Sequence, residues 1–103
     1  MASENLQIRT IISQISVNNY MLSDIQQQRA DIAEELTDVI QQFGQDSPQY
    51  QSALAQTNAI DADLELEQNE LQISNQQLAA WKEGLEESRD NTINDIFSKS
   101  PIG

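Results

Sequence analysis

Carboxylates are the side chains of this 103-residue chain most able to do chemistry, because the chain contains neither cysteine nor histidine. Without these two residue types it has no disulfides, thiolate nucleophiles, imidazole bases or zinc sites of the usual kind. Acids stand at suggestive spacings in two places, residues 61–67 and residues 83–90. The first spacing suggests a calcium loop, and the second suggests an acid–base pair.

The first group, Asp61-Ala-Asp-Leu-Glu-Leu-Glu67, alternates acids as a calcium loop of the EF-hand type begins. Such a loop requires glycine at its sixth position and glutamate at its twelfth, where this chain has Leu66 and Gln72. On a helix, steps of two residues spread the acids around more than one face. We therefore expect a solvated acidic helix here, with no metal ligand and no cofactor.

The second group holds four acids between residues 83 and 90. Paired carboxylates catalyse only where a concave apolar site separates their pKa values, and a thin helical chain offers no such cleft. Lys82 precedes Glu86 by four residues, and Arg89 follows it closely, which is the spacing of ion pairs on a helix surface. The sequence therefore predicts no catalytic residue and a protein that is not an enzyme.

The first half of the chain carries a heptad pattern that begins at Ile8. Apolar residues fill positions a and d as far as Phe43, broken only by Arg29 at a and Asn18 at d. So regular an apolar stripe predicts one helix over about residues 3–43.

A turn is predicted over residues 44–47, between two helices. Gly44 suits the left-handed end of the first helix, Ser47 can cap the second, and Pro48 suits its first position. The second helix is expected over about residues 48–99, followed by a short tail, because Pro101 disfavours helix in the residue before it. Residues 1–103 are thus predicted to form one all-α domain, a long antiparallel two-helix coiled-coil hairpin.

The second helix has a leucine at every seventh residue from 64 to 85. We assign these leucines to position a, which places Glu67, Ser74 and Trp81 at d. With the turn near residues 46 and 47, Arg29 is expected opposite Glu67, and Asn18 near Ser74 and Asn75. Asn18, Arg29, Glu67 and Ser74 are predicted to form shared polar layers that set the register. The alternative for Arg29 is that its charged end reaches solvent while its stem covers the seam.

Apolar residues also lie outside the predicted seam. A two-helix hairpin buries one stripe per helix, so the remainder points to further helices, from a second copy or from another protein. Gly84 near Trp81 either accommodates Ile8 or Ile12 within the hairpin or makes room for another chain. At the C-terminal end, residues beyond about 90 overhang the first helix and either bind a partner or fray. The predicted partner-binding residues are Leu66, Ile73, Trp81, Ile93, Ile96 and Phe97.

Charge limits the partners further. Seventeen acids and five bases give a net charge of −12, which repels nucleic acid and anionic lipid headgroups. No segment approaches the roughly 20 apolar residues of a membrane span, so no membrane insertion is expected. The first residues do not resemble a signal peptide. A cytoplasmic location is therefore the default, and leaderless export stays open.

These patterns favour a non-enzymatic structural or assembly protein that acts by coiled-coil self-association and helix-mediated protein binding. We expect a homo-oligomer, in which further copies complete the hairpin into a bundle. The alternative is a small acidic assembly or secretion chaperone or adaptor that binds a helical or basic protein client. A self-assembling protein gains mass with concentration when alone, whereas a chaperone gains it with its client.

Overall fold

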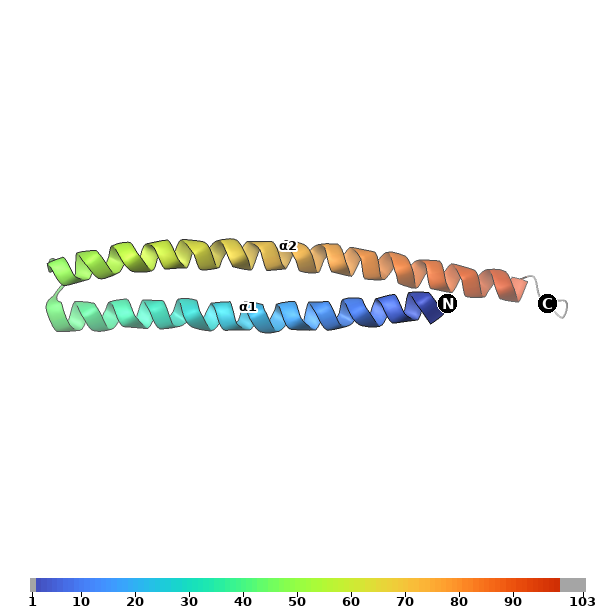
Figure 1. Cartoon of the computed structure of the whole chain (residues 1–103), viewed down its shortest axis with the longest axis horizontal. Helices are drawn as coiled ribbons and strands as arrows, with labels where there is room; N and C mark the ends of the chain where they lie inside the picture. Colours follow the sequence, from blue (N-terminus) through green and yellow to red (C-terminus); the bar gives the residue numbers. More distant parts are fainter. Residues whose placement is uncertain (1, 99–103) are drawn as a thin grey trace. The chain divides into compact units, whose positions relative to one another are not determined.

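The computed structural model describes residues 2–98, with side chains placed for residues 3–96. These residues form two α-helices, α1 (Ala2–Phe43) and α2 (Pro48–Ser98), and contain no strand. The helices make an antiparallel hairpin, as predicted (Figure 1). The expected end of the second helix at Lys99 lies outside the described residues.

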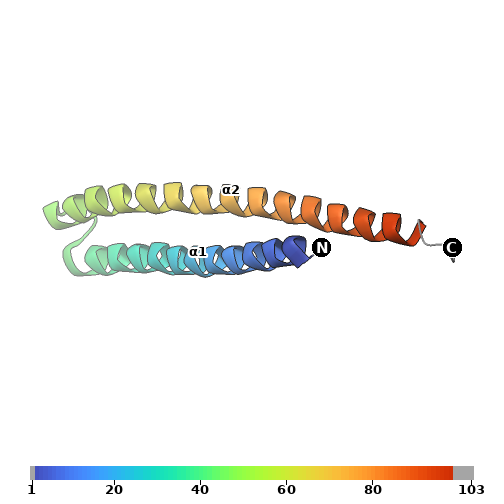
Figure 2. The same cartoon turned by 45° about the vertical axis from the view of Figure 1, so that its right-hand side comes forward.

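The hairpin divides into two compact units. The turn unit comprises residues 19–72 and holds the turn with the adjoining part of each helix. The terminal unit comprises residues 1–18 and 73–103, of which 2–18 and 73–98 are described. Within each unit, the α1 and α2 segments lie side by side in both views (Figures 1 and 2).

The turn has the local structure that its residues predict. Gly44 has a φ of +91°, and its N–H donates to the carbonyl of Ile40 at 2.8 Å, which ends α1. The Ser47 hydroxyl accepts a hydrogen bond from the N–H of Tyr50 at 3.1 Å and so caps α2. Pro48 then occupies the first helical position, where a missing N–H costs nothing.

The seam of α1 follows the predicted register. Its buried and half-buried residues between Ile8 and Val39 recur at alternating steps of three and four. Ile8 and Ile11 are buried in the terminal unit, and Ile25 is buried in the turn unit. Asn18 and Arg29 lie half-buried in this row, at the two places where the apolar pattern breaks.

The seam of α2 is rotated from the predicted one. The leucine row is present, with Leu64 buried, but Glu67 and Trp81, assigned to position d, are exposed. Because Leu64 follows Asp61 by three positions, the leucines occupy d, and from residue 61 onward position a carries a second row that is polar. This row of half-buried residues is Asp61, Gln68, Asn75, Lys82 and Arg89. One heptad earlier, position a holds half-buried Leu54.

The core of both units is thin. Among the residues with described side chains, four apolar ones are buried, namely Ile8, Ile11, Ile25 and Leu64. One polar residue joins them, Thr57, whose hydroxyl donates to the carbonyl of Ala53 at 2.8 Å and is thereby satisfied. Twelve large apolar residues are instead exposed. These are Leu6, Ile12, Val17, Tyr20, Met21, Ile40, Phe43, Ile60, Leu66, Ile73, Trp81 and Ile96.

Candidate protein-binding surfaces

A polar layer built on Arg29 crosses the seam of the turn unit. The guanidinium binds Asp61 with two hydrogen bonds, from Nε at 2.7 Å and Nη2 at 3.1 Å, and donates from Nη1 to Gln68 Oε1 at 2.8 Å. The predicted partner Glu67 is exposed, so this pairing was wrong. The guanidinium turns across to α2, while 32% of the Arg29 side chain stays exposed, so Arg29 is both paired in the seam and partly solvated.

The Arg29 layer shifts the pKa of both charged partners. Hydrogen bonding from Arg29, helped by its charge, lowers the pKa of Asp61 below the ordinary value of 3.8. The same hydrogen bond raises the pKa of Arg29. Both groups therefore stay ionised at neutral pH. Arg29 is the sole base of the turn unit, and its hydrogen bonds hold it in the seam.

A second polar layer lies in the terminal unit. The Asn18 amide donates to Asn75 Oδ1 at 2.9 Å and to Ser74 Oγ at 3.3 Å. The prediction that Asn18 lies near Ser74 and Asn75 is therefore confirmed. Together the Arg29 and Asn18 layers explain the rotation of α2, because it brings Asp61, Gln68 and Asn75 to polar groups of α1.

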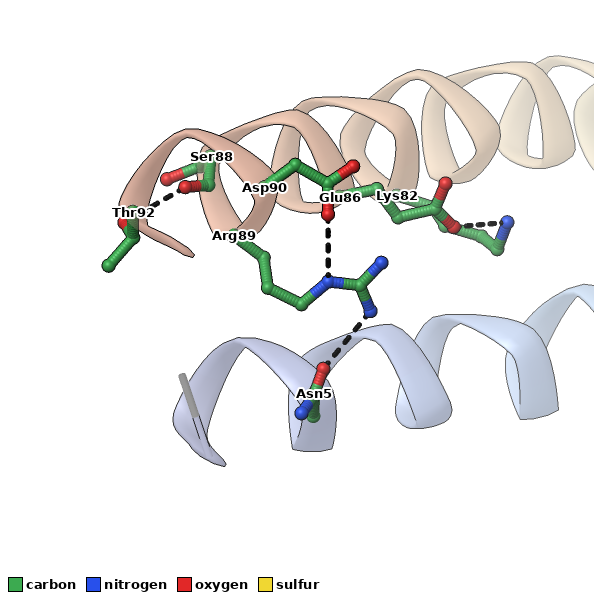
Figure 3. A network of polar contacts seen from close by, with 7 residues as sticks. All are labelled: Asn5, Lys82, Glu86, Ser88, Arg89, Asp90 and Thr92. Carbon is green, nitrogen blue, oxygen red and sulfur yellow. Dashed lines mark hydrogen bonds and ion pairs between the residues drawn. The ribbon is translucent and has the colours of Figure 1, made fainter. Parts of the chain in front are cut away.

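A polar network closes the free end of the terminal unit (Figure 3). Arg89 Nη1 donates to Asn5 Oδ1 of α1 at 3.1 Å, and its Nε lies 3.5 Å from Asp90. Lys82 forms the predicted ion pair with Glu86 at 2.6 Å, which lowers the pKa of Glu86 through a hydrogen bond. Arg89 thus ties α2 to the first turns of α1.

The predicted partner-binding residues are spread over both units. Leu66 lies in the turn unit, exposed by 59%, while Ile73 and Trp81 lie in the terminal unit, each exposed by 53%. The C-terminal end of α2 extends past the start of α1 (Figure 1). In the last turns of α2, Ile93 is half-buried and Ile96 is exposed. The remaining residue of this set, Phe97, has its side chain outside the described ones.

Gly84 does not accommodate a neighbour within the hairpin. A Cβ atom built on it meets no heavy atom within 4 Å, so the expected packing against Ile8 or Ile12 was wrong. Trp81 lies instead against a shallow groove, lined by Leu6 and Ile11 of α1 together with polar residues.

Sequence reasoning missed the groove along one side of the turn unit. Two adjoining hollows of about 530 and 320 Å³ share Val39, Ala53 and Gln56. Leu36 and Phe43 add apolar lining from α1, and Glu35 and Asp38 add acids. The corrected register supplies the missing signal, because it places Ala53 and Ile60 at position g beside this groove.

Charge is divided unevenly between the two units. The turn unit contains eleven acids and one base, whereas the terminal unit contains six acids and four bases. Their net charges are therefore −10 and −2. Like charges disfavour contact between two turn units far more than between two terminal units.

Comparison of the chain with protein-family models, curated proteins and solved structures finds no match. Neither helix, over the residues that the structure describes, has a stretch long and apolar enough to cross a membrane. Within the same residues, no three acids are grouped so that they can hold a metal ion.

Proposed function

We propose that the chain is a non-enzymatic structural or assembly protein that acts by coiled-coil self-association and helix-mediated protein binding. The observation that carries this proposal is the imbalance between four buried and twelve exposed large apolar side chains among the described residues. Burial of apolar surface contributes about 25 cal/mol per Å² and is the main term that holds helices together. A helix pair that leaves twelve such side chains exposed has more to gain from further helices.

The terminal unit is the better candidate for contact between copies. Six of the exposed apolar residues lie there, among them Val17, Ile73 and Trp81. Its net charge of −2 imposes little repulsion, in contrast to the turn unit at −10. Ile96, near the C-terminal end of α2, is exposed as well.

The polar layers have a complementary role in this proposal. Polar residues at seam positions lower stability and favour one register and one set of neighbours. Asn18 with Asn75, and Arg29 with Asp61, would hold α1 and α2 in one alignment and leave the outer residues for partners.

Self-association is tested by the mass of the purified chain over a range of concentrations in analytical ultracentrifugation. We expect the mass to rise with concentration, and the double variant Val17→Gln/Ile73→Gln to stay monomeric. The matched control Ile60→Gln/Leu66→Gln removes two apolar side chains of similar exposure from the turn unit and should associate like the wild type. A constant monomer mass for the wild type would contradict the proposal.

The chaperone or adaptor function is the second candidate, and the charge of the turn unit favours it. A strongly acidic surface attracts basic partners and repels further copies. Under this alternative the chain alone would be monomeric at every concentration, and a defined mass above the monomer would appear only when the client is added.

A further inference from the structure

We propose that the groove along the turn unit docks a basic amphipathic helix of another protein. The groove consists of the two hollows described above, which take their acids, Glu35 and Asp38, from α1. The inference rests on the proposed protein-binding function and deepens it by giving the class of partner. Three features of the turn unit carry it.

The first feature is an apolar floor with no cover from this chain. Leu36 and Val39 are only half-buried, and Phe43 is exposed by 45%. Ile60, seven residues after Ala53 and on the same side of α2, is exposed by 50% and continues the floor. Such a floor between two helices is the usual seat of a third amphipathic helix, whose apolar residues fill it.

The second feature is the position of the acids. In each helix, heptad positions c and g lie on one side of the seam and positions b and e on the other, and in an antiparallel pair the two g sides meet. Seven of the eleven acids of the turn unit stand at c or g, on the groove side. These are Asp24, Asp31, Glu35 and Asp38 of α1 and Asp63, Glu67 and Glu70 of α2.

The third feature is the lack of any base to neutralise these acids. Arg29 is the single base of the turn unit, and its guanidinium is bound to Asp61 and Gln68 in the seam. Glu35 and Asp38 of α1 thus border the hollows without a compensating charge. On the same side of α2, the acids Asp63, Glu67 and Glu70 follow further along the helix. A helix with lysine or arginine beside its apolar stripe matches this arrangement. A second copy does not, because its turn unit carries a net charge of −10.

The probe for this site is a fluorescein-labelled synthetic helix of about three heptads, with leucine at a and d and lysine at e and g. Its control has the same sequence with glutamate in place of every lysine. Fluorescence anisotropy with the full-length chain should show saturable binding of the lysine peptide, weakened by added salt. The glutamate peptide should not bind, and equal binding of both peptides would overturn the proposal, as would no binding of the lysine peptide.

Two matched pairs of variants then place the binding in the groove. Glu35→Gln/Asp38→Asn should weaken binding of the lysine peptide about tenfold, whereas Glu34→Gln/Glu65→Gln, with the same charge change off the groove side, should weaken it less than about twofold. Ile60→Gln should weaken it strongly and Leu66→Gln little. Circular dichroism checks that each variant keeps its helices. Equal effects within either pair would show diffuse attraction to an acidic chain and overturn the proposal.

A second copy in the groove is a separate outcome of the same variants. If Ile60→Gln abolished a concentration-dependent mass of the chain alone, the groove would belong to self-association, and the basic-helix proposal would be wrong. The two proposals can also fail separately. If the chain stays monomeric and still binds the lysine peptide through the groove, self-association is contradicted and the basic-helix proposal stands.

Discussion

Single residues of this hairpin differ sharply in environment although they are neighbours in sequence. Ile11 is 1% exposed and Ile12 is 49% exposed, because one points into the seam of the terminal unit and the other away from it. Charged residues also differ in environment. Arg29 and Asp61 form a bidentate pair in the seam, whereas most other charged side chains are exposed.

The isoleucine pair gives a direct test of the seam. Ile11→Ala should lower the free energy of unfolding by about 2–4 kcal/mol, because it removes a fully buried side chain. Ile12→Ala should cost less than about 1 kcal/mol in the monomer. Urea unfolding followed by circular dichroism at low concentration measures both values. Equal costs would mean that Ile12 is also covered, and would place it in a contact between copies.

Some of the residue-level picture could be predicted and some could not. The pairing of Asn18 with Ser74 could be predicted because the turn near residues 46 and 47 determines which residues of the two helices face each other. The partners of Arg29 were missed, because a long guanidinium side chain reaches acids and amides more than one turn apart on the facing helix. Asp61 and Gln68, which share it, are seven residues apart.

The two helices differ in how far the sequence of each one predicts which of its residues pack in the seam. The pattern of α1 is apolar at both a and d, so its seam could be predicted from the sequence. In α2 only the leucine row is apolar, and a row three residues before or after it completes a seam equally well. Because Ile60 and Trp81 are apolar and lie in the row three residues after the leucines, the sequence favoured that row, which was wrong. The polar repeat from Asp61 to Arg89 shows the right one only when the acceptors for Arg29 and Asn18 are considered.

The two glycines with defined surroundings have opposite roles in their elements. Gly84 is helical and borders open space, so Gly84→Ala should raise the free energy of unfolding by about 1 kcal/mol. Gly44 has a positive φ, so Gly44→Ala should instead lower it by about 1 kcal/mol. Thermal unfolding measures both. A stabilising Gly84→Ala that also weakened self-association would show that another chain packs against Gly84.

Over the whole chain, the dominant feature is the concentration of negative charge in the turn unit. Between about pH 7 and about pH 4.5, falling pH begins to neutralise carboxylates and should reduce their repulsion. We therefore expect helicity, melting temperature or association to rise over this range. Progressive unfolding alone would show that the acids make specific favourable contacts.

Asp61 should behave differently from the other acids at lower pH. Because its pKa is lowered in the folded chain, its stabilising contribution is present above its ordinary pKa of 3.8 and is lost as the pH falls through the lower folded value. The wild type should therefore melt higher than Asp61→Asn near neutral pH, and the two melting temperatures should converge below about pH 3.8. A difference independent of pH would mean that the ionisation of Asp61 adds nothing to the stability of the folded chain.

The aromatic residues divide between the two units in a way that is useful for spectroscopy. Trp81, the single tryptophan, lies in the terminal unit, and both tyrosines, Tyr20 and Tyr50, lie in the turn unit. Tryptophan emission therefore follows the terminal unit alone, while circular dichroism follows both helices. Coincident melting curves from the two signals would show one cooperative transition, and an earlier change in emission would show that the terminal unit opens first.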